Sequence, residues 1–392
     1  MHRIVVLGGG YGGLRAIEKL VHTPHTEITL IDRNGYHYMQ TEVYGYIAGT
    51  KDIDELAIDL EAWCEGFDKP VRFVRAEVKG IDTENCTVRL DGKSIPYDSL
   101  IIATGAKTNF PPFIEGLRAH SYGVKRLDRA FGFHHRFQHM VERKLEGDDE
   151  IINIVVAGAG LSGVEVAAEM AYMLRRYRKM IGKREREIRI TLVDACDTIL
   201  PGMHPRLIQS ALKRLENLGV IVRTSAFIAS VDDRRLHFKD GDRIPYTFII
   251  FTGGIQGVSD FVPETFEKNR LEQLKVTPHL RVKGHTDIYA IGDVAEITDS
   301  EGNPLPPTAQ IAEKSAEYVA KSISNRLRNV ETAPFAAKMD GLFIALGGRY
   351  GAAELFGVRF SGIGVYYLKR IVTLIYYLGI SLRVNAGYKV RK

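Results

Sequence analysis

Two glycine-rich stretches, each followed by an acidic residue, are the parts of this sequence best suited to bind a ligand. Gly8, Gly10 and Gly13 follow the apolar run IVVL, and Asp32 ends the next apolar run. Glycines at this spacing let the backbone approach a pyrophosphate, a helix start supplies partial positive charge, and the acid accepts hydrogen bonds from a ribose. A bare GxGxxG is often only a turn. Here run, turn and acid are in register, which predicts a dinucleotide site.

The same pattern returns further along the chain, in INIVVAGAGLSGVEVAAEM. Gly158, Gly160 and Gly163 form the second turn, and Asp194 ends the matching apolar run. No Lys or Arg directly follows Asp194 in DACDTI, where one would meet a 2′-phosphate, so the pattern favours NADH over NADPH. Two such sites in one chain suggest a flavoprotein that holds FAD in one and receives a nicotinamide cofactor in the other.

A third stretch, IYAIGDVAE, supports the FAD interpretation. A strand there would deliver Asp293 to the FAD site, where a short carboxylate can bond ribityl hydroxyls and the following helix start can face the flavin or its phosphate. Taken alone, the GD pair is more often a strand-ending turn. Together with the two glycine turns it favours FAD.

The elements that must position these residues follow from the apolar runs. Residues 4–7 and 27–32 read as buried parallel strands around a helix, and residues 152–158 and 188–194 repeat the plan. We therefore predict an α/β fold with two Rossmann-like dinucleotide-binding domains and a C-terminal membrane-associating region. The expected boundaries are 1–112 and 274–334 for the two parts of the FAD-binding domain, 113–273 for the NADH-binding domain, and 335–392 for the membrane-anchoring region.

Composition sets limits on the class of protein. The 392 residues are 45% apolar and 26% charged, typical of a soluble globular protein, and a net charge of +5 is too mild to argue for nucleic acid. Cys64, Cys86 and Cys196 form no disulfide framework and no CxxC motif, which fits a reducing compartment. The first strand starts at Ile4, so we expect no signal peptide, and we expect no run long enough to span a bilayer.

Three histidines at short spacing raise the question of a metal. His135 and His139 stand four residues apart beside His134, but no nearby acid or third ligand completes a set. A surface helix is the better interpretation, and we predict no metal.

The end of the chain is the one strongly biased segment. From Leu355 to Lys392 there are seven Lys or Arg and no Asp or Glu. Residues 365–384 read as a helix with a broad apolar surface and tyrosines suited to a bilayer interface. Lys369, Arg370 and Arg383 would meet anionic headgroups at about 1 kcal/mol each. A core helix that closes the fold, or a dimer contact, is the alternative. Membrane attachment is favoured.

The chain resembles the two-dinucleotide-binding-domain flavoproteins. Within them it resembles the type II NADH dehydrogenases, which are single-subunit, non-pumping NADH:quinone oxidoreductases. The similarity runs through VVLGGGYGG, YHYMQTEVYGYIAG, LIIATGAKTNF, VVAGAGLSGVEVAAEM, FTGGIQG, YAIGDVAE and PPTAQIA. The last phrase is similar to the family's quinone-site helix and is the most discriminating. The family usually reads AQxAxQ, whereas Lys314 stands at the second glutamine position here, which leaves the pocket's polarity and the acceptor open.

The resemblance implies site residues. Glu165 is expected to bond the nicotinamide amide, and Glu169, on the same helix face, to lie near a proton path; the alternative is that they are solvated helix carboxylates. Gln310 and Lys314 are expected beside the quinone. The residues expected around FAD are Gly8, Gly10, Tyr11, Gly12, Gly13, Asp32, Arg33, Thr41, Ala103, Thr104, Gly105, Gly292, Asp293, Ala309 and Gln310. Those expected around NADH are Gly158, Gly160, Leu161, Ser162, Gly163, Glu165, Asp194, Thr252, Gly253 and Gly254.

The expected function is therefore a peripheral NADH:quinone oxidoreductase with non-covalent FAD, on the cytoplasmic side of the cell membrane. Its expected partners are NADH, a quinone and the membrane surface, with a homodimer left open. A soluble NADH-dependent reductase of another electron acceptor and a redox-sensing NADH-binding flavoprotein are the alternatives. Disulfide reductases and sulfide:quinone reductases are disfavoured because the three cysteines lack the required placement.

Overall fold

The first glycine turn belongs to a five-stranded parallel sheet. The structure is a computed structural model that describes residues 1–146, 150–181 and 188–390. The IVVL run is buried on both faces, at most 1% exposed, as an unalternating apolar run predicts. Helix α1 (Tyr11–Leu20) starts directly after the turn. The sheet order is β21 (Ile288–Ala290), β9 (Ser99–Ile102), β1 (His2–Leu7), β2 (Thr26–Asp32) and β5 (Val71–Arg75).

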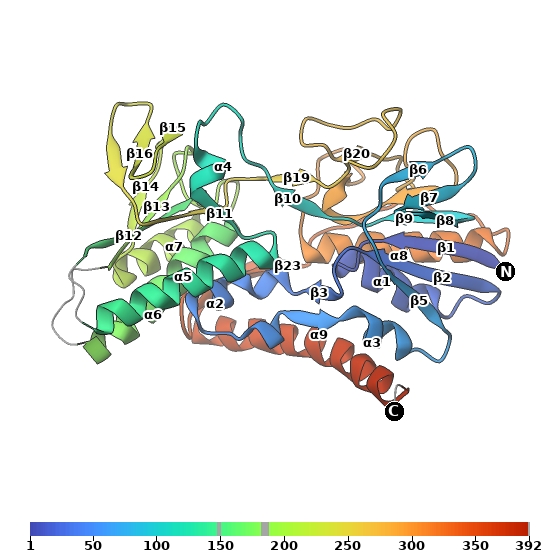
Figure 1. Cartoon of the computed structure of the whole chain (residues 1–392), viewed down its shortest axis with the longest axis horizontal. Helices are drawn as coiled ribbons and strands as arrows, with labels where there is room; N and C mark the ends of the chain where they lie inside the picture. Colours follow the sequence, from blue (N-terminus) through green and yellow to red (C-terminus); the bar gives the residue numbers. More distant parts are fainter. Residues whose placement is uncertain (147–149, 182–187, 391–392) are drawn as a thin grey trace.

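The second glycine turn belongs to a second parallel sheet with the same plan, which confirms the predicted α/β duplication. Helix α6 (Leu161–Ile181) follows the turn and leads to the next strand. The two sheets occupy opposite halves of the molecule (Figure 1). The order of the second sheet is β11 (Ser121–Gly123), β18 (Phe248–Phe251), β12 (Ile152–Ala157), β13 (Ile188–Val193) and β14 (Ile221–Arg223).

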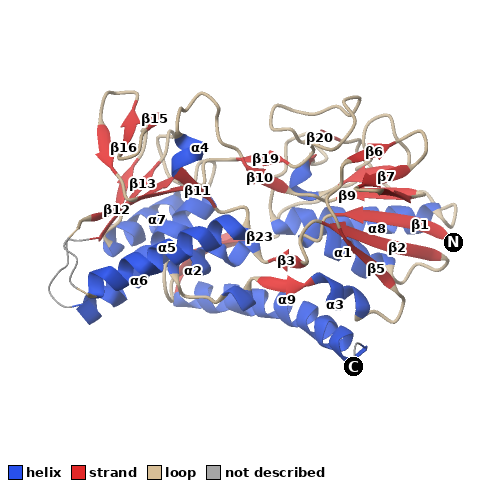
Figure 2. Ribbon diagram, in the orientation of Figure 1, coloured by secondary structure: helices blue, strands red, loops and turns tan. Residues whose placement is uncertain are grey.

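Each half carries a small antiparallel meander, and one strand pair links the halves. An Asp-Gly pair turns between two strands in each meander, at 91–92 and at 240–241, with Gly92 and Gly241 at positive φ. Figure 2 shows the link, in which β10 (Ala106–Thr108) pairs antiparallel with β19 (Ile255–Gly257). The meanders are β6 (Gly80–Asp82), β7 (Thr87–Leu90) and β8 (Lys93–Pro96), and β15 (Ile228–Val231), β16 (Arg235–Phe238) and β17 (Arg243–Pro245).

The remaining elements fill the connections. One expectation is wrong here: the helix expected directly after Asp293 is only the 3-10 turn Gly292–Val294, and the α-helix that follows begins at Ala309. The α-helices are α2 (Val43–Ala48), α3 (Leu60–Glu65), α4 (Leu117–His120), α5 (Leu127–Leu145), α7 (Pro205–Leu218) and α8 (Ala309–Arg326). The short strands are β3 (Tyr36–Tyr38), β4 (Ala57–Asp59), β20 (Leu274–Lys275) and β22 (Ala295–Glu296), and the other 3-10 turns are Gln40–Glu42 and Ile53–Glu55.

The chain ends in a three-stranded meander and a long helix. Strands β23 (Gly341–Ala345), β24 (Gly351–Leu355) and β25 (Val358–Gly362) lead into α9 (Ile363–Val390), which runs beneath both halves along the lower edge of Figure 1. One face of α9 packs on α3, so closely that a Cβ on Gly387 would overlap the carbonyl oxygen of Ala62. On this face the alternative of a helix that closes the fold is correct.

The opposite face of α9 is an exposed apolar stripe. Within the described residues α9 is long and apolar enough to cross a membrane by length and composition, so the expectation that no segment reaches that limit is wrong. We use the name apolar stripe for Ile363, Tyr367, Ile371, Leu374, Ile375, Leu378 and Leu382, which recur every three or four residues and are all exposed.

Only part of the predicted basic character of this region lies on the surface: Arg370 and Lys389 are exposed, whereas three other basic side chains contact the protein. Arg359 pairs with Glu354, Lys369 pairs with Glu165, and Arg383 lies over the Phe67 ring. Arg391 and Lys392 lie outside the described residues. The headgroup role expected of Lys369 is therefore wrong, because its ammonium points into the protein.

Candidate functional site

A cavity of about 920 Å³ joins the first glycine turn to the C-terminal region. This volume is at the large end of the range of ligand sites, which is roughly 300–1,000 Å³. Fourteen of the fifteen residues expected around FAD line it: Gly8, Gly10, Tyr11, Gly12, Asp32, Arg33, Thr41, Ala103, Thr104, Gly105, Gly292, Asp293, Ala309 and Gln310.

The glycines of the first turn have two different roles: some allow close approach of the backbone, and one borders open space in the cavity. Gly8 has φ +104°, and a Cβ there would overlap the carbonyl oxygen of Ala103; Gly13 does not line the cavity, and a Cβ on it would overlap the carbonyl oxygen of Gly8. Gly8 thus lets the turn approach the end of β9, and Gly13 lets α1 approach the turn. A Cβ on Gly10 would meet no atom within 4 Å and would enter open space at the start of α1. A phosphate fits there, facing free backbone N–H groups.

The second turn has the same geometry. A Cβ on Gly163 would overlap the carbonyl oxygen of Gly158, whereas one on Gly160 would meet open space. The residues therefore fit a second dinucleotide. Of the residues expected around NADH, Leu161, Ser162 and Glu165 line the large cavity, and Gly158, Gly160, Gly163, Asp194, Thr252, Gly253 and Gly254 lie outside its lining.

Each ribose acid is fixed by backbone N–H donors. Asp32 accepts hydrogen bonds from the N–H groups of Gly9 and Asn34, both at 2.7 Å. Asp194 accepts from the N–H groups of Ala159 and Cys196 in the same way. Burial raises the pKa of Asp32, and the two N–H donors oppose this rise because they favour the carboxylate. Both carboxylates are thus held at the edge of their glycine turns.

Asp293 reaches the cavity as expected, with a partner that the sequence did not reveal. Its carboxylate forms an ion pair of 3.1 Å with Lys125, from the loop that precedes α5, and both side chains line the cavity. The two residues are 168 positions apart, and no local pattern marks Lys125. The pair ties the two halves of the molecule together beside the expected FAD position.

Glu165 forms a buried ion pair with Lys369 of α9. The Lys369 ammonium lies 2.6 Å from Glu165 Oε1, which also accepts a hydrogen bond of 2.9 Å from the Ala345 N–H. The Glu165 side chain is 13% exposed and the Lys369 side chain is 16% exposed. Burial by itself lowers the pKa of Lys369, but the Glu165 carboxylate and Tyr44 outweigh it and raise that pKa. The solvated alternative for Glu165 is wrong.

Sequence reasoning missed Lys369 as a cavity residue, although a signal was present. Val365, Thr373 and Tyr376 lie on the same helix face as Lys369, at spacings of three and four, and Val365 is buried. A lysine in register with the buried positions of an amphipathic helix points inward. Lys369, Thr373 and Tyr376 all line the cavity.

Glu169 is also buried rather than solvated. The residue is only 6% exposed, and its carboxylate accepts a hydrogen bond of 3.1 Å from the Gly348 N–H. Burial raises the pKa of Glu169, while the Gly348 and Thr50 donors lower it. It does not line the large cavity and lies one turn beyond Glu165.

The unusual Lys314 faces away from the cavity lining. Its ammonium bonds the Lys338 carbonyl oxygen at 2.6 Å and Asp340 Oδ1 at 2.7 Å. Gln310 does line the cavity and exchanges two hydrogen bonds with Asp340, of 3.0 and 3.2 Å. Lys314 thus fastens the segment before β23 to α8; it does not itself line the cavity, whereas its partner Asp340 does.

Replacing Lys314 with methionine tests this fastening. The pair is partly exposed, so the loss of stability should stay below ~1 kcal/mol. We expect the KM for an added quinone to rise by up to about fivefold, with FAD content and the KM for NADH unchanged, because Asp340 loses one of its anchors. Steady-state kinetics with D340N as the matched variant measure this. An altered KM for NADH in K314M would contradict the assignment.

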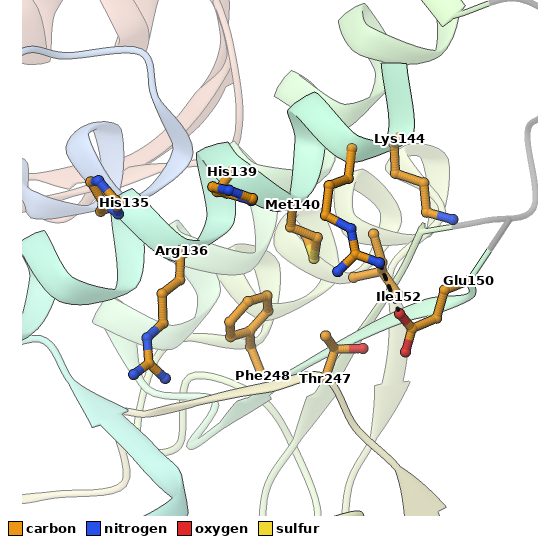
Figure 3. Close-up of a pocket in the computed structure, with 10 residues that line it drawn as sticks. His135, Arg136, His139, Met140, Lys144, Glu150, Ile152, Thr247 and Phe248 are labelled. Carbon is orange, nitrogen blue, oxygen red and sulfur yellow. Dashed lines mark ion pairs between the residues drawn. The ribbon is translucent and has the colours of Figure 1, made fainter. Parts of the chain in front are cut away.

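A second, smaller groove lies on α5. It has a volume of about 290 Å³, and His135, Arg136 and His139 lie along it (Figure 3). Arg143 and Glu150, which also line it, form an ion pair with an N–O distance of 3.9 Å. It contains none of the expected site residues. His134 instead stacks on Tyr46, with ring centroids 4.5 Å apart. In the described part of the chain, no three His, Cys, Asp or Glu side chains gather as a metal site would require.

The cysteines also lie apart from the cavity. All three are within the described residues and free, and none of them lines the cavity. Cys64 is buried in the hydrophobic core around the first glycine turn's sheet, where burial raises its pKa to about 12, and Cys196 is exposed beside Asp194. Such thiols offer no redox-active pair beside the flavin position.

Comparison with known proteins gives consistent matches. The family profile for pyridine nucleotide-disulphide oxidoreductases matches residues 2–316. Type II NADH:quinone oxidoreductase from Staphylococcus aureus is 30% identical over 388 residues, and that from Staphylococcus haemolyticus is 29% identical over 384, each covering 94% of both chains.

Solved structures share the fold. NDH2 from Plasmodium falciparum in complex with NADH superposes with a TM-score of 0.85 at 20% identity, covering 99% of this chain and 96% of that one. The sulfide:quinone oxidoreductase from Aquifex aeolicus superposes with a TM-score of 0.80 at 19% identity, covering 98% and 92%. At these identities the two structures speak for the fold alone.

Proposed function

The chain belongs to the type II NADH:quinone oxidoreductases of the pyridine nucleotide-disulphide oxidoreductase family, and on that premise we propose that it oxidises NADH and reduces a membrane quinone in one cavity. FAD, when bound, would supply the redox chemistry that links hydride transfer from the nicotinamide to reduction of the quinone. The protein's own residues bind, orient and shield these partners.

The observation that supports this proposal is that one cavity extends from the first glycine turn, and from the helix after the second, to the C-terminal region. Gly10 lines it at the first glycine turn, Glu165 lines it at the second turn's helix, and Phe356 and Val372 line it in the C-terminal region. Phe356 is 87% exposed and Val372 is 50% exposed. A substrate with an apolar tail can therefore enter beside exposed apolar side chains, while a nicotinamide enters from the other domain.

The residue roles follow from this layout. We assign the FAD phosphates to the amides around Gly10 and the adenosine ribose to Asp32, and the NADH pyrophosphate to Gly160 with its ribose at Asp194. Glu165 would orient the nicotinamide amide, with Lys369 holding the carboxylate in place. Gln310, fixed by Asp340, would present its amide to the quinone. The domain boundaries 1–112, 113–273, 274–334 and 335–392 are proposed on the same grounds.

The apolar stripe of α9 supports attachment along a membrane surface. From Ile363 to Leu382 the stripe extends about 29 Å at ~1.5 Å per residue. The other face of the helix is committed to α3 and to the buried Lys369, which a helix crossing a bilayer would have to give up. We therefore propose an in-plane helix with its apolar side in the lipid, on the cytoplasmic face where NADH is available.

Stopped-flow spectroscopy tests the function directly. NADH should bleach the bound flavin, and ubiquinone or menaquinone in liposomes should restore its colour at a rate that sustains turnover. Ferricyanide serves as an acceptor that needs no membrane. If flavin reduced by NADH were reoxidised by soluble acceptors but by no quinone, the proposed acceptor would be wrong.

Membrane attachment has its own prediction, in the variant L378D/L382D. Each fully buried leucine contributes about 1.5–3 kcal/mol, so the pair should weaken liposome binding by about 100-fold or more. NADH:ferricyanide activity should persist, because neither side chain lines the cavity. Sedimentation with liposomes measures the effect. Point changes serve better than deletion of α9, which would remove Lys369 and Tyr376 from the cavity.

The matched control is I221D, an equally exposed apolar residue on β14 of the second sheet. Its liposome binding should equal that of the unchanged protein. If L378D/L382D bound liposomes as well as I221D does, the stripe would not be the attachment surface.

A further inference from the structure

Glu313 is a cavity carboxylate to which the proposed function gives no role. It lies on α8, three residues after Gln310, and is half-buried. Six other carboxylates line the same cavity, and each has a hydrogen-bond or ion-pair partner: Asp32, Glu42, Asp128, Glu165, Asp293 and Asp340. Among the described residues, no hydrogen bond or ion pair reaches Glu313.

The charges around Glu313 are already matched with one another. On α1, Arg15 bonds Glu18 at 3.0 Å and Glu317 at 2.7 Å, and Lys19 lies 3.6 Å from Glu317. Two cations thus face two carboxylates, with no cation left for Glu313. A third carboxylate charge, on Glu313, would have no cation to balance it.

Two tyrosines complete the surroundings. Tyr11 of α1 and Tyr376 of α9 line the cavity with ring centroids 5.2 Å apart, and both interact electrostatically with Glu313. Burial raises the pKa of Glu313 to about 7, with Glu18 and Glu317 adding to the rise and Arg15 opposing it. The group therefore carries a proton for much of the time at neutral pH.

Quinone reduction needs such a proton. A quinone becomes a quinol by taking two electrons and two protons, whereas the hydride that leaves NADH supplies two electrons and only one proton. The second proton must come from an acid in the site or from water. The other carboxylates of the cavity are engaged in hydrogen bonds or ion pairs, whereas Glu313 has neither in the described part of the chain, so Glu313 is the side chain best placed to act as that acid.

We propose that Glu313 is the proton donor to the bound quinone, an inference that rests on the proposed function. The carboxylic acid O–H breaks, its proton forms the second quinol O–H, and the Glu313 carboxylate then takes a proton from water at its exposed side. Quinone, hydride equivalent and one proton give quinol, so atoms and electrons balance.

The test compares E313Q with the unchanged holoenzyme across pH 5 to 9. Glutamine keeps the shape of the side chain and cannot donate the proton. In the unchanged protein, kcat for quinone should fall as pH rises through about 7, because the acid loses its proton. E313Q should show a kcat lower by about 100-fold at pH 6, the lower end of general-acid effects, and no inflection near pH 7. Ferricyanide takes no proton, so its reduction should be unchanged.

The matched control is E317Q, one turn along α8. Glu317 pairs with Arg15 and does not line the cavity. Because Glu317 adds to the rise in the Glu313 pKa, E317Q should keep an inflection in its quinone profile, moved to lower pH. A quinone profile in E313Q identical to that in E317Q would overturn the proposal.

Thermal denaturation gives a readout that does not depend on turnover. The pKa of Glu313 is about 7 in the folded protein against 4.5 for the free side chain, so between these values the native state binds more protons than the unfolded chain. Stability attributable to this group therefore falls as pH rises from about 4.5 to 7. E313Q should raise Tm more at pH 8 than at pH 5, and an equal shift at both would also count against the proposal.

Failure of this inference is distinguishable from failure of the function. If the unchanged protein reduces quinones and E313Q does so with the same profile, the function stands and Glu313 is not the donor. If no quinone is reduced by the unchanged protein while ferricyanide is, the acceptor itself is wrong, and the Glu313 inference falls with it.

Discussion

The variant G10V should be colourless, because it should fold and yet fail to retain FAD. A Cβ at Gly10 meets no protein atom within 4 Å, and the residue's φ of −83° suits valine, so the change should not disturb the sheet or α1. The added methyl groups occupy the space where a pyrophosphate would approach the first N–H groups of the helix. Two lost charge-assisted hydrogen bonds should weaken binding by at least ~3 kcal/mol, or more than about 100-fold.

The measurement is the ratio of flavin absorbance to protein after purification, with circular dichroism to establish that the fold is retained. G160V is the matched control, since a Cβ there also meets open space, at the start of α6. It should stay yellow and show a raised KM for NADH. G13V, whose Cβ would overlap the Gly8 carbonyl oxygen, should instead destabilise the protein. A fully yellow G10V would mean that the first turn does not hold FAD.

The second large effect is expected at the Glu165–Lys369 pair. K369M leaves the Glu165 carboxylate buried without its cation, and removal of one partner of a buried pair costs about 3–5 kcal/mol. E165Q likewise leaves the Lys369 ammonium buried without its carboxylate partner. The double variant E165Q/K369M removes both charges and should recover most of the loss, because no uncompensated charge remains.

Denaturant unfolding of the four proteins measures this cycle. The exposed pair Lys79–Glu77, with an equally short distance of 2.6 Å, is the matched control. K79M should leave the free energy of unfolding almost unchanged, because water screens an exposed pair. If K369M were as mild as K79M, the pair would not be a buried strut between α6 and α9.

The same variants separate structure from chemistry. If Glu165 orients the nicotinamide, E165Q should raise the KM for NADH by about tenfold, the worth of one charge-assisted hydrogen bond, and the double variant should not recover it. Recovery of both stability and NADH affinity in the double variant would assign Glu165 a structural role only.

How far the sequence could predict the site depended on the distance between partners. The two glycine turns and their acids lie within one βαβ unit each, where strand, turn and helix follow one another, and fourteen of the fifteen residues expected around FAD line one cavity. Gly13 is the exception because its role is to let α1 approach the Gly8 carbonyl oxygen rather than to face a ligand.

Lys369 and Lys314 show why the rest could not be predicted. Sequence patterns assign both lysines from their immediate neighbours, Lys369 to a basic tail and Lys314 to a quinone pocket. Their partners, Glu165 and Asp340, lie 204 and 26 residues away, and only packing decides which way a long side chain turns. Lys125 and Asp293 are likewise paired by packing although they are 168 residues apart.

By itself the sequence determined the duplicated α/β plan, the two nucleotide turns and the presence of an apolar C-terminal helix, because these depend on periodicity and on glycine spacing over short stretches. Only the tertiary structure decided which charges are paired. It left α9 with an apolar face outward and Lys369 inward, and it left Glu313 as the cavity carboxylate without a partner in the described chain. The physical reason is that burial and Coulomb interactions act between groups brought together by folding, whatever their separation along the chain.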